Sequence, residues 1–268
     1  MQDASLQLPA PMIPAAERPS LLTRVGLHGP SYRVRLAESA DDLRAAQALR
    51  FVVFNVELKE GLARSFASCL DIDEFDAVCD HLLVEDSHSS EIVGTYRLQT
   101  GASAGNHHGY YSAREFDFAP YDALRAQMLE LGRACIHQQH RSFAVLGLLW
   151  RGIGQYASQH GVRYLIGCSS LTSQDPGVGA ATWQRLSDHL APPQWRTLPL
   201  PGYACPLDRP ASHAPKTPKL LAAYLSLGAM MCGPPAIDRE FGTIDFLTLV
   251  DLRSPAQARR LARLGIAI

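Results

Sequence analysis

Met128-Leu129-Glu130-Leu131-Gly132-Arg133-Ala134-Cys135-Ile136-His137 is the stretch on which the fold prediction depends. Its first nine residues, 128–136, are mostly apolar or small, which predicts a buried strand. Residues 143–159 follow as a longer apolar run that predicts a helix, and 163–169 predict another short strand. A strand, a helix and a strand in this order are typical of a sheet that is covered by helices.

Segments on both sides of this unit extend the predicted sheet. Residues 81–85 and 92–99 predict two strands, and the polar linker 86–90 between them predicts a hairpin. The other expected elements are a strand at 32–36, a helix through 45–56, a loop at 101–109, a helix at 179–190, an irregular segment at 192–218, a helix at 220–231 and a strand at 244–251. The expected fold class is α/β (α+β), with one mixed, twisted sheet flanked by helices.

The helix through 45–56 is expected to begin near Ser39, because Asp42 stands three residues later in a capping-box pattern. Its apolar residues follow helical spacing and would form one stripe: Ala45, Leu49, Val52, Val53 and Val56.

Composition limits the class of protein. The chain has 268 residues, of which 47% are hydrophobic, and 25 Lys and Arg against 26 Asp and Glu give a net charge of −1. A nearly neutral chain argues against nucleic acid as a partner. Six cysteines without a Cys-x-x-Cys pair are typical of reduced thiols. With no secretory signal and no apolar run of membrane-spanning length, we expect a cytoplasmic protein, with peripheral contact at the inner membrane face left open.

Three regions are expected along the chain. Residues 1–30 contain five prolines and little periodicity, which predicts a disordered N-terminal segment. Residues 31–252 are expected to form one domain, and 253–268 a basic C-terminal helix.

The densest group of charges is Asp71-Ile72-Asp73-Glu74-Phe75-Asp76-Ala77-Val78-Cys79-Asp80-His81. A calcium loop of the EF-hand type needs Gly at its sixth position and Glu at its twelfth, where this chain has Asp76 and Leu82. Calcium is therefore excluded. Two interpretations remain open, namely an acidic site for a cationic substrate and a solvated acidic turn.

Glu130 and Arg133 are costly inside an apolar strand unless they are paired or face a cleft. Burial raises the pKa of a carboxyl group, so a partly buried Glu130 could act as a general base near neutral pH. Strict alternation places the two side chains on opposite faces, and a bulge near Gly132 would bring them together. The alternative is a structural ion pair.

The start of the helix at 143–159 is a possible anion site, because the first N–H groups of a helix lack intrahelical partners and Arg141 stands just before it. A plain amphipathic helix is the alternative. Cys135, His137 and His140 offer three metal ligands without a fourth, so no metal site is expected.

Taken in order, these segments resemble the ornithine N-acyltransferase group of the GNAT superfamily, which is related to the N-acyl-homoserine lactone synthases. The resemblance runs from about Tyr32 to Asp251. Its carriers are Leu49-Arg50-Phe51-Val52-Val53-Phe54, the run Asp71–His81, Val93-Gly94-Thr95-Tyr96-Arg97-Leu98, Glu130-Leu131-Gly132-Arg133, Gly147-Leu148-Leu149-Trp150, Leu220–Ala229 and Ile237-Asp238-Arg239-Glu240-Phe241-Gly242-Thr243-Ile244-Asp245.

The resemblance implies a sheet that splays open near the Glu130 strand. It also implies transfer of a (3-hydroxy)acyl chain from an acyl carrier protein thioester to the α-amine of ornithine, the first step of ornithine lipid synthesis. No cofactor would be bound permanently, and acyl-phosphopantetheine would be the donor. The helix start 141–146 lacks the glycines of the usual GNAT pyrophosphate loop, which favours a carrier protein over acyl-CoA.

The resemblance further implies roles for single residues. Glu130 would act as the base, and Arg133 or Arg97 would hold the substrate carboxylate. The expected binders of a second amine are Asp73, Asp76 and Asp80 together with His81. The expected binders of phosphopantetheine and the acyl chain are Arg141, Gly147, Leu148, Leu149 and Trp150.

Two other functions remain open from sequence. One is a synthase of the N-acyl-homoserine lactone type or an enzyme with another amine acceptor, such as glycine, lysine or glutamine. The other is a non-catalytic module that docks a carrier protein or an anionic membrane through the helix 220–231 and the basic residues Arg253, Arg259, Arg260 and Arg263. For that helix, burial in the core is the alternative.

Overall fold

The computed structural model describes residues 23–25, 32–209, 217–255 and 259–260. The helices are α1 (Ala40–Phe51), α2 (Gly101–Asn106), α3 (Phe143–Gln159), α4 (Pro176–Arg185) and α5 (Lys219–Ser226). The strands are β1 (Thr23–Val25), β2 (Tyr32–Leu36), β3 (Asp80–Asp86), β4 (Ile92–Thr100), β5 (Met128–Ile136), β6 (Tyr164–Leu171), β7 (Met230–Met231), β8 (Ala236–Asp238) and β9 (Thr243–Asp251).

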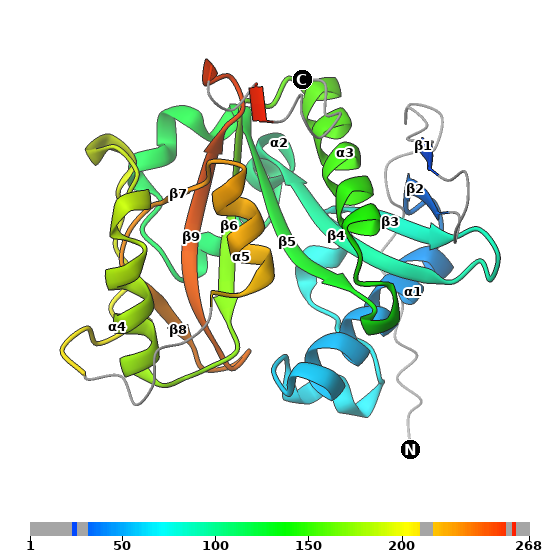
Figure 1. Cartoon of the computed structure of the whole chain (residues 1–268), viewed down its shortest axis with the longest axis horizontal. Helices are drawn as coiled ribbons and strands as arrows, with labels where there is room; N and C mark the ends of the chain where they lie inside the picture. Colours follow the sequence, from blue (N-terminus) through cyan, green and yellow to red (C-terminus); the bar gives the residue numbers. More distant parts are fainter. Residues whose placement is uncertain (1–22, 26–31, 210–216, 256–258, 261–268) are drawn as a thin grey trace.

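Within these ranges the strands form one nine-stranded sheet in the order β1-β2-β3-β4-β5-β6-β9-β7, with β8 also paired to β9 (Figure 1). Neighbouring strands are antiparallel except β5 and β6, which are parallel. A parallel pair needs a crossover connection, and α3 supplies it. The predicted mixed sheet, its β3–β4 hairpin and the strand–helix–strand unit are confirmed.

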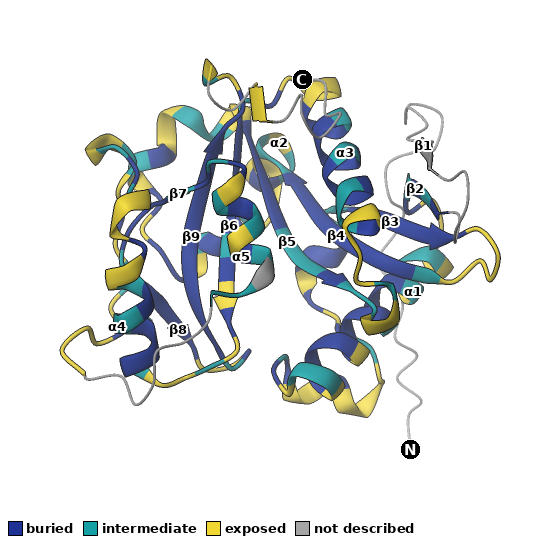
Figure 2. Cartoon of the chain, in the orientation of Figure 1, coloured by how far each residue is buried: buried dark blue, intermediate teal, exposed yellow. Residues whose placement is uncertain are grey.

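Helices cover both faces of the sheet. On one face, α3 packs with Tyr224 and Leu227 into the largest apolar cluster, while α1 and α2 lie on the other face. The strands are mostly buried and the helices expose their outer sides (Figure 2). Leu221, at 1% exposed, and Tyr224, at 7%, pack one side of α5 into the core, as the alternative interpretation stated.

The helix through 45–56 begins as predicted and ends differently. The Ser39 side chain accepts from Asp42 N, but from Val52 to Leu58 the backbone is π-helical. In a π-helix each carbonyl accepts from the amide five residues later. Apolar residues that would share one face of an α-helix therefore rotate out of line, and some turn away from the core. Val52 and Val56 are 42% and 55% exposed.

Other boundaries also correct the sequence prediction. The expected loop at 101–109 begins with α2, which Thr100 caps by accepting from Ser103 N. The expected helix at 220–231 ends at Ser226 and continues into β7, and the helix expected at 179–190 is α4 with a short 3₁₀ turn after it. In the segment expected to be disordered, Thr23–Val25 pairs with β2. Most of residues 1–30 and of the predicted tail 253–268 lie outside the described residues.

The sheet opens between its two parallel strands. β5 and β6 pair only from Met128↔Tyr164 to Glu130↔Ile166, after which β5 follows β4 and β6 follows β9. A Cβ added at Gly167 would lie 2.2 Å from the Leu131 carbonyl oxygen, so glycine permits the last close approach of the strands. We call the space between residues 132–136 and 168–171 the gap. The splayed sheet expected from the family resemblance is therefore present.

Candidate active site

A β-bulge shapes the β5 side of the gap. Thr95 pairs with Cys135 and Arg97 pairs with Gly132, so Arg133 and Ala134 together lie opposite one residue of β4. Arg133 has φ of 49°, a left-handed conformation that a bulged residue can adopt. The extra residue places Arg133 on the face of the sheet that carries Arg97. The predicted bulge is confirmed.

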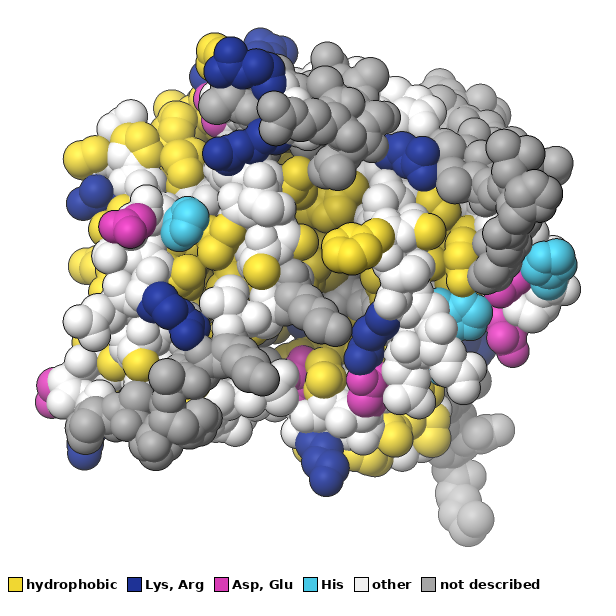
Figure 3. All heavy atoms as spheres, viewed as in Figure 1, with side chains coloured by type: hydrophobic (Ala, Val, Ile, Leu, Met, Phe, Trp, Pro, Cys, Tyr) yellow, Lys and Arg dark blue, Asp and Glu magenta, His cyan; other side chains and the backbone are white. Residues whose placement is uncertain are grey.

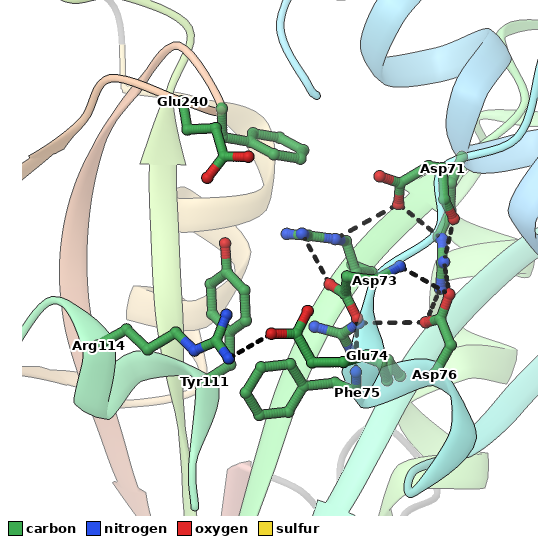
Figure 4. Close-up of polar contacts among 12 residues, drawn as sticks. Asp71, Asp73, Glu74, Phe75, Asp76, Tyr111, Arg114 and Glu240 are labelled. Atoms are coloured by element: carbon green, nitrogen blue, oxygen red, sulfur yellow. Dashed lines mark hydrogen bonds and ion pairs between the residues drawn. The ribbon is translucent and has the colours of Figure 1, made fainter. Parts of the chain in front are cut away.

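A network of three arginines and three aspartates lies on this face: Arg50, Arg97, Arg133, Asp71, Asp73 and Asp76. Every member's side chain is at most 8% exposed. Figure 4 shows the aspartates gathered on one side of an open space, with Glu240 on the other side. We call this set the Arg–Asp network.

Asp76 lies at its centre. Its carboxylate accepts from Arg50 Nη2 at 2.6 Å and Nη1 at 3.0 Å, and from Arg97 Nη1 at 3.1 Å. Gln47 Nε2 adds a bond at 3.0 Å. Opposite charges at these distances in a buried site stabilise each other strongly.

Asp73 joins two arginines. It accepts from Arg97 Nη1 at 2.5 Å and from Arg133 Nη2 at 3.0 Å. Burial alone would raise the pKa of Asp73, but Arg97 and Arg133 outweigh burial and hold this pKa below its usual range. Asp73 is therefore ionised at neutral pH and its charge is already matched.

These contacts change the roles assigned from sequence. Asp73 and Asp76 are neutralised by arginines, and Asp80 accepts from Tyr156 Oη at 2.7 Å on the α3 side of the sheet. Burial lowers the pKa of His81 to about 4, so its ring is neutral, and its Nε2 lies 3.1 Å from Asp76 O. We therefore do not assign the second amine to these four residues.

Arg133 is the member of the network that reaches the opposite wall of the gap. Its guanidinium lies 4.8 Å from the Tyr111 ring centroid and 4.5 Å from that of Phe241, which belongs to the connection between β8 and β9. Each arginine pairs with two aspartates, Arg133 with Asp71 and Asp73 and Arg97 with Asp73 and Asp76. Arg97 is 4% exposed and lies farther from the Tyr111 ring centroid, at 5.5 Å. Of the two arginines expected to hold a substrate carboxylate, the geometry favours Arg133.

Glu130 is buried below the gap, at 4% exposed. Its Oε2 accepts from Tyr111 N at 2.7 Å and its Oε1 from Ser112 N at 2.8 Å. Burial raises its pKa although both amides oppose the shift. The carboxylate thus fixes the Tyr111–Ser112 segment. The Ser112 hydroxyl adds a further bond, which leaves the carboxylate at least one lone pair that can accept from a water.

The residues expected to bind the donor lie around the start of α3. Arg141 is already in a two-point ion pair with Glu57, and Ser142 caps α3 by accepting from Val145 N. No atom lies within 4 Å of a Cβ built on Gly147. The side chains expected to form the acyl slot, Leu148, Leu149 and Trp150, are instead packed in the main core.

A small apolar cavity lies beside the point where β5 and β6 separate. Its lining residues are Leu131, Leu165, Ile166, Gly167, Tyr224, Thr248 and Val250. On this face of the molecule, Figure 3 shows hydrophobic side chains around a hollow between α5 and α3. An acyl chain that enters the gap from this face would meet these walls rather than Leu148 and Leu149.

A second group of buried carboxylates lies across the gap and was not predicted from the sequence. On the β6–β9 side, Glu115 and Asp245 are 2% and 4% exposed, and Glu60 is buried nearby. Asp245 stands between Ile244 and Phe246 in β9, so it carries the same signal as Glu130, a charge inside an apolar strand. Arg50 was likewise noted only within a motif, although it is buried in the Arg–Asp network.

Comparisons with known proteins identify the family. Residues 49–151 match the Acetyltransferase (GNAT) domain family. An L-ornithine N(alpha)-acyltransferase of Agrobacterium fabrum (strain C58) is 34% identical over 258 residues, which are 90% of this chain and 87% of that protein. The chain belongs to the L-ornithine N(alpha)-acyltransferase family. A member from Rhizobium meliloti (strain 1021) is 35% identical over 237 residues, 81% of this chain and 79% of that protein.

Family membership makes the chain an enzyme of the N-acyltransferase class. Two solved structures share the fold. FeeM, an N-acyl amino acid synthase from uncultured soil microbes, has a TM-score of 0.53 and 13% identity, and the match covers 88% of this chain and 99% of that one. TofI in an apo form has a TM-score of 0.50 and 18% identity, and the match covers 87% of this chain and 97% of that one. Across the described ranges, no helix is long and apolar enough to cross a membrane.

Proposed function

We propose that this protein transfers a 3-hydroxyacyl chain from an acyl carrier protein to the α-amine of ornithine. Four relatives at 34–35% identity carry the name L-ornithine N(alpha)-acyltransferase, which supports ornithine as the acceptor. The structural observation that carries the proposal is Arg133, a buried arginine that a bulge turns toward the gap. A guanidinium there suits the carboxylate of an amino acid.

The reaction requires a free amine, because an ammonium has no lone pair for attack on a thioester. In our proposal Glu130 takes the proton through a water, and its raised pKa favours this step. The amine nitrogen forms a bond with the acyl carbon, the carbon–sulfur bond breaks, and the phosphopantetheine thiol leaves with a proton. A backbone N–H of the splayed strand β5 would stabilise the oxyanion.

A carrier protein is the donor that the start of α3 favours. Arg141 is engaged by Glu57, and residues 141–146 include no glycine to cradle a pyrophosphate. Phosphopantetheine on a carrier protein has a single phosphate, which the free N–H groups of α3 and Ser142 suit. Such carriers are cytoplasmic and the product is an amphiphile, so we place the reaction in the cytoplasm, at the inner membrane face.

Purified protein tests the proposal directly. It is mixed with a 3-hydroxyacyl carrier protein or the matching acyl-CoA, and with ornithine or putrescine as the acceptor, and the products are measured by mass spectrometry. We expect N-acylornithine, formed at least 10-fold faster from the carrier protein, and little product from putrescine, which lacks the carboxylate that Arg133 would hold. No product from either donor would refute the proposed function.

A further inference from the structure

The β6–β9 side of the gap holds a group of carboxylates with little matching positive charge. Ligand atoms of Glu115, Cys168 and Asp245 all lie within 4.8 Å of one another. Glu60 and Asp238 are close enough to Asp245 to act on it electrostatically. We call Glu60, Glu115 and Asp245 the carboxylate cluster, since Asp238 is satisfied by the amides of Glu240 and Phe241, both at 2.9 Å.

Two oxygens of the carboxylate cluster lack a hydrogen-bond donor among the described residues. They are Asp245 Oδ1 and Glu60 Oε2, and both belong to side chains that are less than 9% exposed. Arg133 is the positive charge that acts on both Glu60 and Glu115, and it is already paired with Asp71 and Asp73. Buried acceptors without donors are uncommon in proteins and call for an explanation, such as a bound water, ion or ligand.

Glu115 and Asp245 reduce this unmatched negative charge by holding a proton between them. Burial raises the pKa of Asp245 to about 6, and burial together with Asp245 raises the pKa of Glu115 well above its usual range. Carboxylates this close cannot both ionise unless a cation joins them. A ligand with a positive charge would replace the proton and supply the missing donors.

We propose that the carboxylate cluster binds the side-chain ammonium of the acceptor amino acid. This inference rests on the proposed function, and it moves the second-amine site from the Arg–Asp network to the opposite side of the gap. Ser170, which pairs with Asp245 across β6 and β9, is exposed, and Cys168 is half-buried, so the cluster lies next to solvent.

The two walls would then hold an ornithine by its ends. Arg133 binds the carboxylate, the carboxylate cluster binds the side-chain ammonium, and the α-amine between them faces the thioester. An ammonium offers three N–H donors, which matches two orphaned oxygens and the Glu115 carboxyl. Glycine or an amino acid with an apolar side chain would leave these buried groups unpaired, so it would react slowly.

Acceptor analogues test this inference. Acyl transfer to ornithine is compared with transfer to norvaline, which has the same carbon chain and no side-chain amine, from the same carrier-protein donor. We expect the wild-type protein to prefer ornithine by at least about 100-fold in kcat/KM, and Asp245→Asn and Glu115→Gln to reduce that preference at least about 10-fold. Asp251→Asn, on the same strand but paired with Arg163, is the matched control and should keep the preference.

The outcomes separate the two proposals. If wild-type protein acylates ornithine and norvaline equally, the cluster inference fails while the proposed transferase stands. If ornithine is not acylated at all, the proposed function fails. Calorimetry adds a readout that needs no turnover and no variant: ornithine binding should release close to one proton from the Glu115–Asp245 pair and norvaline binding none. Equal proton release, or tight Zn²⁺ binding that blocks ornithine, would overturn the inference.

Discussion

Replacing Asp76 by Asn removes the central negative charge of the Arg–Asp network. The native carboxylate accepts two bonds from Arg50, at 2.6 and 3.0 Å, one from Arg97 at 3.1 Å and one from Gln47 at 3.0 Å. Asn can accept some of these bonds, but it leaves two buried guanidiniums short of negative charge. Breaking a buried ion pair in this way costs about 3–5 kcal/mol, and we expect the free energy of unfolding to fall by this amount.

Glu74→Gln is the matched control, because Glu74 lies two residues away and pairs with Arg114 at 2.5 Å with both side chains over 40% exposed. That change should cost less than about 1 kcal/mol. Urea denaturation at pH 7, with unchanged m-values, measures both losses. A loss for Asp76→Asn that equals the loss for Glu74→Gln would refute the reasoning.

The same variants make a prediction about pH. The arginines hold the pKa of Asp76 far below its usual range in spite of burial. Its stabilising effect is therefore complete above the unfolded-state pKa, about 4, and is lost as the pH falls further. The difference between wild type and Asp76→Asn should stay constant from pH 5 to 8 and shrink by about 1.4 kcal/mol per unit below pH 4. A difference that grows on acidification would contradict the assignment.

Three further predictions concern single residues. Burial lowers the pKa of His81 to about 4, so only the unfolded state gains the histidine proton as the pH falls from about 6.5 toward 4. The free energy of unfolding of the wild type should therefore fall by up to about 3 kcal/mol in this range. His81→Asn should lose less stability, and urea titrations measure the difference. Gly167→Ala would place a Cβ 2.2 Å from Leu131 O and should destabilise the protein by about 2 kcal/mol or more. Gly147→Ala, which adds its Cβ in open space, should instead stabilise α3 by about 0.5–1 kcal/mol. Thermal melts of the two variants measure both effects. Glu130→Gln should slow acyl transfer at least about 100-fold and remove the acidic limb of the pH–rate profile; near-normal turnover would exclude Glu130 as the base.

Much of the fold could be predicted because it depends on local patterns. The polar linker 86–90 between two apolar runs gave the β3–β4 hairpin, and the long apolar run gave α3 with its correct ends. The bulge at Arg133 was also predictable, since two charges three residues apart in a strand share a face only if the alternation is broken.

The rest depends on contacts between distant segments. The π-helical turn at Val52–Leu58 has no signal in an apolar spacing that also fits an α-helix. The charges of Asp73 and Asp76 were visible, but their neutralisation by Arg50, Arg97 and Arg133 required knowledge of how one helix and two strands lie in space. The acidic run therefore suggested a cation site, while the cluster with unmatched charge lies across the gap on Asp245 and its neighbours.

The most direct test of the account is the position of the new amide bond. Purified protein, a 3-hydroxyacyl carrier protein and ornithine labelled with ¹⁵N only at the α-amine yield a product whose fragments are read by tandem mass spectrometry. The account predicts ¹⁵N in the amide of essentially all product, because Arg133 and the carboxylate cluster hold the two ends of ornithine. Unlabelled amide nitrogen, or an even mixture of both isomers, would contradict it.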